Sequence, residues 1–239
     1  MAVQTTAADF HLRSSQAMSL SSLSPFSVTC WVNAVWNGGS VVSLVGIYGG
    51  SSDAPLAAPV TAMQIGTNAG NYDLRCWTWG GAALVATANG VMTGFNNVWV
   101  QITYTFDGTN HRLYRNGVLL ASAVSTQPTG QLNQVYINGY PGSGTGETTA
   151  FQIDQYALYR RALSADEILT MYYAGGFRHG IVNDLICRYE FDELAQGVAC
   201  NNVPDLSGNG HTLTSVGAGT PFSYTYTNTL VQSNIRPVL

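Results

Sequence analysis

Apolar and polar residues alternate along many short segments of this chain. From Phe26 to Val35 the apolar side chains fall on every second position, as expected for a strand with one buried face. Tight-turn sequences such as Asp107-Gly108 and Asn116-Gly117 separate neighbouring segments, which favours antiparallel hairpins. The same alternation predicts further strands at about 40–47, 60–66, 72–79, 82–88, 98–106, 112–115, 118–124, 134–140 and 150–160.

A different pattern appears at the end of residues 151–173, where the last of these strands gives way to a helix. Ser164 is a typical helix N-cap, and Glu167 three residues later completes a capping box. Gly175 is placed to end the helix. The chain is therefore predicted to be all-β, an antiparallel β-sandwich with one short helix near residues 165–173.

The composition narrows the class of protein. A length of 239 residues suits one large domain, or a domain with extensions. Charged residues make up 9% of the chain, lysine is absent, and the net charge is −4, so we expect no nucleic-acid partner. The chain shows no signal peptide and no apolar stretch of about 18 residues, so we expect synthesis in the cytoplasm without membrane insertion.

The four cysteines and four histidines do not form a metal-ligand pattern. Cys30, Cys76, Cys187 and Cys200 contain no C-x-x-C pair, and the histidines lie far apart in the sequence. Reduced, buried thiols are the preferred interpretation, and a Cys187–Cys200 disulfide is the alternative. We expect neither a metal nor another cofactor.

Four segments carry a resemblance to a known family. They are 26–32 (Phe-Ser-Val-Thr-Cys-Trp-Val), 99–108 (Trp-Val-Gln-Ile-Thr-Tyr-Thr-Phe-Asp-Gly), 113–117 (Leu-Tyr-Arg-Asn-Gly) and 153–168, which starts with Ile-Asp and ends with Ala-Leu-Ser-Ala-Asp-Glu-Ile. In this order and spacing they resemble the laminin-G-like, concanavalin A-like lectin/glucanase jelly roll, of the kind found in bacteriophage structural proteins. The resemblance implies a jelly-roll sandwich over most of the chain.

One part of the chain departs from the usual order of this family. Residues 188–193 and 205–211 resemble the strand and loop that usually open such a domain, but here they come last. They either complete this chain's own sandwich in permuted order, which is preferred, or pair with a neighbouring subunit. The chain is accordingly divided into a sandwich at 1–180, a completing strand and loop at 181–214, and an extended arm at 215–239.

Because related jelly rolls include glycan hydrolases, the acidic residues are candidates for catalysis. Glu190 and Asp192 alternate on one face of a predicted strand, and a retaining glycosidase needs two carboxyl groups about 5–5.5 Å apart. The related glucanases carry another acid three residues after the aspartate, where this chain has Ala195. Hydrolysis is therefore a minor alternative, and no catalytic residue is predicted.

The Asp205-Leu-Ser-Gly-Asn-Gly segment is interpreted as a tight turn, with calcium ligation as the alternative.

Two tryptophans are the best candidates for glycan contact. Trp77 and Trp79 alternate on one face of a predicted strand beside Tyr72. Sugar rings stack on exposed aromatic faces, so these three residues are the predicted glycan-binding set. Packing in the core or against another subunit is the competing interpretation.

The extended arm is too apolar for comfortable exposure to solvent. Its candidate assembly contacts are Phe222, Tyr224, Tyr226, Leu230 and Ile235. Together with the family resemblance, this arm indicates a non-enzymatic virion structural protein, either a bacteriophage capsid decoration protein or a tail-associated protein. We expect it to form a homo-oligomer and to contact other virion proteins. The alternative is a lectin-like, carbohydrate-binding module that attaches to cell-surface glycans.

Overall fold

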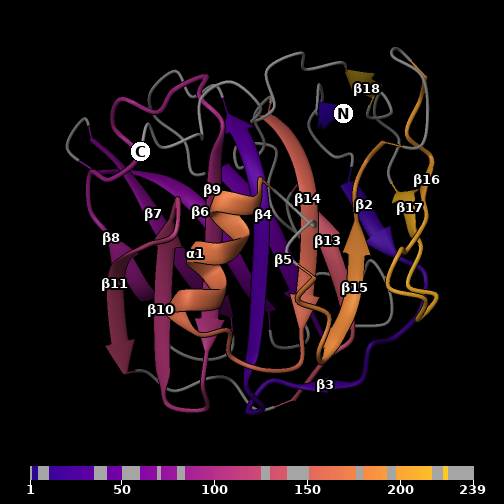
Figure 1. Ribbon diagram of the computed structural model, residues 1–239, viewed down its shortest axis with the longest axis horizontal. Coiled ribbons are helices and arrows are strands. Elements are labelled where there is room, and N and C mark those ends of the chain that lie inside the picture. The colour runs from indigo at the N-terminus through magenta and orange to yellow at the C-terminus, as the bar shows by residue number, and fades with distance from the viewer. Residues whose placement is uncertain are drawn as a thin grey trace.

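Two layers of antiparallel strands with one helix on the outside form the molecule (Figure 1). The structure is a computed structural model. It describes residues 2–4, 11–34, 42–49, 60–68, 71–79, 84–124, 130–138, 151–175, 180–192, 198–216 and 223–225.

The first layer is an eight-stranded sheet, called sheet A here. Its pairings are antiparallel, and β15 (Leu185–Tyr189) joins it by pairing with the C-terminal half of β14 (Phe151–Tyr159). The other strands, in spatial order, are β11 (Val118–Val124), β10 (Asn110–Arg115), β9 (Val100–Phe106), β4 (Phe26–Ala34), β14 (Phe151–Tyr159), β1 (Ala2–Gln4) and β18 (Ser223–Thr225).

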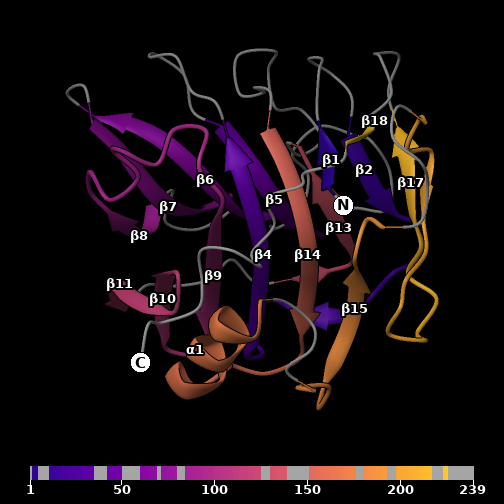
Figure 2. The same cartoon turned by 45° about the horizontal axis from the view of Figure 1, so that its top comes forward.

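The second layer, sheet B, is also eight-stranded and lies behind sheet A (Figure 2). A short pair of β12 (Gln131–Leu132) and β3 (Leu20–Ser21) lies apart from both sheets. The strands of sheet B, in spatial order, are β16 (Asn202–Val203), β17 (Leu213–Val216), β2 (His11–Ser14), β13 (Gln134–Ile137), β5 (Val42–Tyr48), β6 (Val60–Asn68), β7 (Asn71–Trp79) and β8 (Leu84–Ala88).

The main hydrophobic core fills the space between the two sheets. Alternate residues of β4, including Val28, Cys30 and Val32, face alternate residues of sheet B such as Met63 and Leu74. These side chains are almost fully buried, and burial of apolar surface is the principal stabilising term of such a sandwich. The predicted all-β sandwich is confirmed.

The outer face of sheet A is more buried than a strand with one buried face would be. All seven residues of β9 are buried, including Gln101, Thr103 and Thr105 on the side away from the core. Thr103 donates a hydrogen bond to the hydroxyl of Thr29 on β4 at 2.9 Å, which satisfies part of this polar face. Simple alternation predicts that such polar residues are exposed, so the structure differs there.

The helix α1 (Ala165–Ala174) packs against this outer face, as Figure 2 shows. The predicted capping box is present: the Glu167 backbone N–H donates to the Ser164 hydroxyl, and the Ser164 backbone N–H donates to the Glu167 carboxylate. Gly175 ends the helix with a φ of 65°, a left-handed conformation that suits glycine. Ile168 and Met171 bury the inner side of the helix in a second, smaller core.

The C-terminal strands pair with distant strands of the same chain. β15 pairs with β14, and β17 pairs with β2 near the N-terminus. The division of the chain at residues 180 and 214 stays a prediction, since the pairings do not define separate units. Among the described residues, no helix is long and apolar enough to cross a membrane.

All four cysteines are free and buried, so the alternative Cys187–Cys200 disulfide is not formed. Burial raises the pKa of the Cys76 thiol to about 12, and it also raises the pKa of Cys30 and Cys187. These thiols therefore stay protonated at neutral pH and act as small apolar side chains.

Candidate functional site

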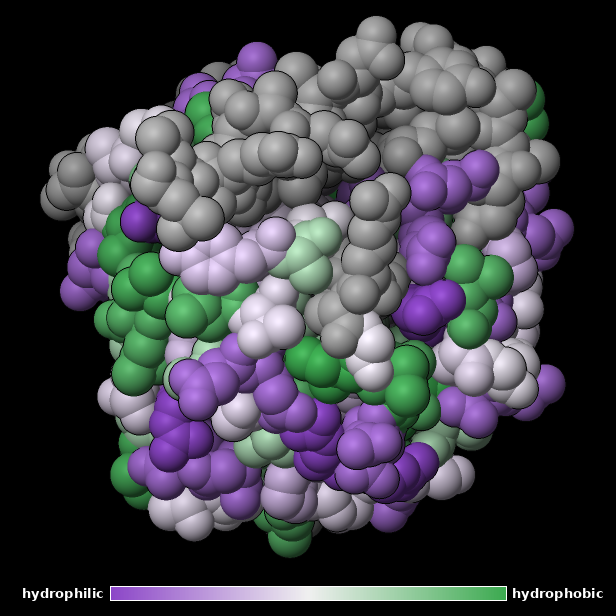
Figure 3. Space-filling model, viewed as in Figure 1, coloured by the Kyte–Doolittle hydropathy of each residue, from purple (hydrophilic) through white to green (hydrophobic). Residues whose placement is uncertain are grey.

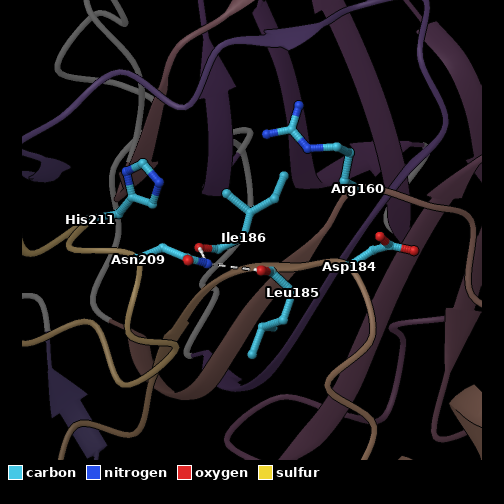
Figure 4. Close-up of a pocket in the computed structure, with 6 residues that line it drawn as sticks. All are labelled: Arg160, Asp184, Leu185, Ile186, Asn209 and His211. Carbon is cyan, nitrogen blue, oxygen red and sulfur yellow. Dashed lines mark hydrogen bonds between the residues drawn. The ribbon is translucent and has the colours of Figure 1, made fainter.

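An open cavity of about 340 Å³ lies where the end of β14 meets the start of β15. Arg160 follows β14 directly, and Asp184 directly precedes β15, whose Leu185 and Ile186 also line the cavity. Asn209 and His211 enter from the loop between β16 and β17. In Figure 4, Arg160 and Asp184 lie on one side of the space above Ile186, and His211 and Asn209 lie on the other.

One carboxylate builds the loop that carries Asn209 and His211. Asp205 Oδ1 accepts hydrogen bonds from the backbone N–H groups of Arg188 and Ser207, and Oδ2 accepts from the Ser207 hydroxyl and the His211 backbone N–H. Partial burial acts to raise the pKa of Asp205, but these hydrogen bonds outweigh it and hold the pKa below its usual value. Both carboxylate oxygens are therefore committed to the turn.

Calcium ligation by this loop, the alternative interpretation of the sequence, gains no support from its geometry. The four donors around Asp205 occupy its acceptor positions. In the part of the chain that the structure describes, no group of three or more His, Cys, Asp or Glu side chains could hold a metal ion.

Arg160 presents a fixed positive charge to the cavity. Its Nη1 and Nη2 atoms donate to the carbonyl oxygens of Ser19 and Met18 at 3.3 and 3.2 Å. Within the described ranges no carboxylate forms an ion pair with Arg160, whereas its neighbour Arg161 makes a bidentate pair with Glu167 at 2.6 and 2.8 Å. A guanidinium has five N–H donors, so Arg160 keeps donors for a ligand.

The opposite side of the cavity offers hydrogen-bond acceptors and a versatile ring. Asn209 Nδ2 donates to the carbonyl oxygens of Leu185 and Ile186, both at 3.0 Å, which leaves Asn209 Oδ1 as an acceptor. The buried Nδ1 atom of His211 has no hydrogen-bond partner among the described residues, so no contact of Nδ1 selects one ring tautomer. His211 Nε2 can therefore donate to or accept from a ligand.

Two residues beside the cavity adopt the left-handed backbone conformation without being glycine. They are Ser19, with a φ of 49°, and Asp184, with a φ of 59°. Ser19 supplies a carbonyl that holds Arg160, and the Asp184 carbonyl accepts a hydrogen bond from the Arg160 backbone N–H at 2.7 Å. Such conformations cost on the order of 1–3 kcal/mol and gather at functional sites.

The acidic residues considered for catalysis lie at the other end of β15. Arg188 forms an ion pair with Glu190 at 3.3 Å, and Asp192 is exposed. The structure adds Asp154, which is 1% exposed. Burial raises the pKa of Asp154 well above its usual value, and the charges of Asp192 and Glu190 raise it further. Alternation along β14 could have placed Asp154 on the outer face, but not beside these two acids.

Of the predicted glycan-binding residues, Tyr72 has a described side chain, and it is not among the described residues that line this cavity. Tyr72 is half-buried, packs against the main core, and its backbone N–H donates to the Thr93 hydroxyl. The backbone of Trp77 and Trp79 lies in β7, but their side chains are outside the described residues. Their role in glycan binding stays a prediction.

The backbone of Tyr224 pairs with Val3 in the β18–β1 pair, and the other predicted assembly contacts, Phe222, Tyr226, Leu230 and Ile235, lie outside the described residues.

The cavity residues themselves were not predicted as a site. The sequence singled out the loop at 205–211 as a turn, which the contacts of Asp205 support, but it gave no reason to join that loop to Arg160 and Asp184. The feature that brings Arg160 and Asp184 together is the pairing of β14 with β15. This pairing joins segments that are far apart in the sequence, so the local pattern does not reveal it.

Solved structures of similar fold are distant in sequence. A candidate carbohydrate-binding protein from Bacteroides ovatus has a TM-score of 0.58 at 14% identity, over 92% of this chain and 60% of its own. This chain thus spans less than two thirds of the Bacteroides protein. A heptameric SAP-like pentraxin from Limulus polyphemus has a TM-score of 0.55 at 13% identity, over 74% of this chain and 84% of its own. These likenesses show the fold alone.

The family follows from the sequence profile that matches. A comparison with curated proteins finds no match. The profile of the concanavalin A-like lectin/glucanases superfamily matches residues 6–169, which is more than half of the chain. This chain therefore belongs to the concanavalin A-like lectin/glucanase superfamily.

Proposed function

We propose that this chain is a carbohydrate-binding module without catalytic activity, and that the cavity beside β15 holds the ligand. The observation that carries the proposal is the mixed lining of that cavity, with the donors of Arg160 facing Asn209 Oδ1 and His211 across an apolar floor at Ile186. Binding sites of this kind are concave and combine apolar surface with a few placed polar groups.

The chemistry of a sugar fits this lining. Each sugar hydroxyl both donates and accepts, so it needs donors and acceptors close together, and the C–H groups of the ring suit an apolar surface. Arg160 supplies donors, Asp184 and Asn209 Oδ1 supply acceptors, and the volume of about 340 Å³ lies at the lower end of the range for small-molecule sites. The Bacteroides ovatus protein of similar fold is a candidate carbohydrate-binding protein, which supports testing this ligand class.

The absence of catalysis is proposed from the positions of the carboxyl groups. Glycoside hydrolysis by the usual mechanisms uses two of them on either side of the bond. Asp184 supplies the one carboxyl group among the described residues that line the cavity. Glu190 is held by Arg188 at the far end of β15. The cavity is therefore suited to holding a sugar and lacks a general acid paired with a nucleophile.

A glycan array with the labelled full chain tests the proposal. We expect saturable binding of a subset of glycans, strongly reduced in His211→Ala, because His211 loses its hydrogen bond to the ligand. Binding should persist in Arg112→Gln, a control whose side chain pairs with Asp107 in the β9–β10 turn. A chain that binds no glycan, or a His211→Ala variant that binds like the parent, contradicts the proposal. Loss of binding in Trp77→Ala or Trp79→Ala alone would place the site on β7.

The second candidate is the virion structural role, in which copies of the chain associate with one another and with other virion proteins. One observation favours association. The edge strand β11 carries no charge and exposes Val118, Leu119 and Val124 at 59%, 49% and 73%. Figure 3 shows hydrophobic residues gathered at the left margin of the molecule, which is where β11 lies in the same view in Figure 1. Uncharged edge strands promote pairing between chains.

Sedimentation analysis tests this second candidate. If β11 mediates association, Val124→Arg shifts the chain to monomer, because a charge at an edge opposes pairing. Val182→Arg is the matched control, since Val182 is 56% exposed and lies outside β11. Removal of residues 216–239 tests the predicted assembly contacts of the arm in the same way. A parent chain that is monomeric at high concentration, and that copurifies with no particle, contradicts the structural role.

A further inference from the structure

We infer that the cavity beside β15 selects sugars that carry a carboxylate, such as uronic acids, and that Arg160 is the residue that recognises the carboxylate. This inference rests on the proposed carbohydrate-binding function and adds the class of sugar. The inference depends on which arginines around the cavity are paired with carboxylates and which are not.

Arg160 differs from the arginines near it because none of the carboxylates that the structure describes is paired with its charge. Arg161 is paired with Glu167, and Arg188 is paired with Glu190. Two neutral carbonyl oxygens hold Arg160 instead, and no described carboxylate lies within ion-pair distance of it. A guanidinium that is oriented but not neutralised is suited to a bidentate contact with a carboxylate.

The anchoring of Arg160 lowers the cost of that contact. The carbonyls of Met18 and Ser19 each take one N–H group and fix the plane of the guanidinium before a ligand arrives. The side chain therefore loses little further conformational freedom on binding, which is the usual benefit of preorganisation. Arg160 is exposed, so its remaining donors are accessible to a ligand.

The acceptors around the cavity account for the sugar part of the ligand. The carboxylate of Asp184 is 60% exposed, and its Oδ2 lies 4.0 Å from Arg161 Nε, so part of its negative charge is offset by Arg161. Asp184 and Asn209 Oδ1 can accept hydrogen bonds from hydroxyl groups. A carboxylate alone would use Arg160 but would leave these acceptors unused.

Nuclear magnetic resonance titration of the full chain tests the inference with three probes: D-glucuronate, D-glucose and acetate. We expect glucuronate to shift the Arg160 Nε–Hε signal and the Asn209 side-chain amide signals, with an affinity at least about tenfold above that of either other probe. Salt should weaken glucuronate binding and leave glucose binding unchanged, because salt screens an attraction between charges.

Three variants separate the role of Arg160 from a general loss of structure. Arg160→Gln should weaken glucuronate binding about tenfold or more and weaken glucose binding much less, because glucose loses a hydrogen-bond donor but no attraction between charges. Arg112→Gln, which removes a distant paired arginine, should change neither. Asp184→Asn removes a negative charge and keeps an acceptor oxygen, so glucuronate should bind as tightly as before or more tightly. The backbone amide spectrum of each variant shows whether it is folded.

Each remaining outcome overturns the inference in a distinct way. Equal binding of glucose and glucuronate contradicts the carboxylate selectivity and leaves the proposed function intact. Equal binding of acetate and glucuronate contradicts recognition of the sugar. A folded Arg160→Gln variant that binds glucuronate like the parent contradicts the role of Arg160. If none of the probes binds and the glycan array is also negative, the proposed function and the inference are both wrong.

Discussion

Single side chains organise this protein through hydrogen bonds that they make to the backbone. Asp205 is the clearest example, because both of its carboxylate oxygens hold the loop that carries Asn209 and His211. Gly208 and Gly210 within the loop have φ values of 88° and 80°, a conformation that other residues adopt only with strain. The sequence predicts a turn here, since Asx and glycine residues have these local roles, and the turn is present.

At the residue scale we predict that Asp205→Ala lowers the free energy of unfolding by about 2–4 kcal/mol. The change leaves the backbone N–H groups of Arg188 and His211 without their acceptor. Urea denaturation at neutral pH measures the effect. Asp184→Asn is the control, because its carboxylate is 60% exposed and asparagine also tolerates the left-handed backbone of this position, so it should cost less than about 0.5 kcal/mol. Equal stability of Asp205→Ala and the parent would show that these bonds do not hold the loop.

At the scale of elements, some features can be predicted from a short stretch of sequence, whereas others depend on segments that are distant in the sequence. The helix is predictable because its start signal lies within Ser164–Glu167 and is complete in that short stretch. The burial of the outer face of β9 is not predictable in this way, because it depends on segments outside the strand that pack over sheet A. The cavity is not either, since Arg160 and Asp184 meet through the pairing of β14 with β15, and Asn209 joins them through its hydrogen bonds to Leu185 and Ile186.

The start of α1 gives a prediction about pH. Hydrogen bonds from Arg161, opposed by partial burial and aided by the Ser164 backbone, lower the pKa of Glu167 from 4.5 to about 2. Because the folded state holds the ionised form more tightly, the stabilisation is complete above pH 4.5 and is lost as the pH falls through 2. We expect Glu167→Gln to cost about 1 kcal/mol at pH 7 and less at pH 2.

Chemical denaturation at a series of pH values checks this expectation. Asp166→Asn is the matched control, since it removes a charge from the same helical turn and its carboxylate makes no hydrogen bond within the described residues. A Glu167→Gln variant whose stability falls in parallel with that of the parent between pH 4.5 and 2 would contradict the assigned role.

At the scale of the whole molecule, two eight-stranded sheets enclose a core that takes in all four cysteines. The prediction is that a thiol reagent such as dithiobis-nitrobenzoate modifies none of them in the folded protein and all four after denaturation. Burial blocks access to all four thiols, and it raises the pKa of Cys30, Cys76 and Cys187, so their reactive thiolate is scarce. Rapid modification of even one thiol in the native chain would show that the core is less closed than described.

The wider arrangement places a polar cavity at one end of a sandwich whose interior is apolar. The end of β14 and the loop before β17 hold Arg160 and His211 on opposite sides of that cavity. The hydrogen bonds that hold Arg160 and the His211 loop in place are the basis of the proposed binding function, since preorganised groups bind with a smaller loss of freedom.

A crystal structure of the chain with the glycan that binds best on the array is the most direct test of this account. The account predicts a sugar above Ile186, in contact with both Arg160 and His211, with its acidic group on the Arg160 guanidinium. A sugar that lies instead over β7, or anywhere out of reach of Arg160 and His211, would contradict it.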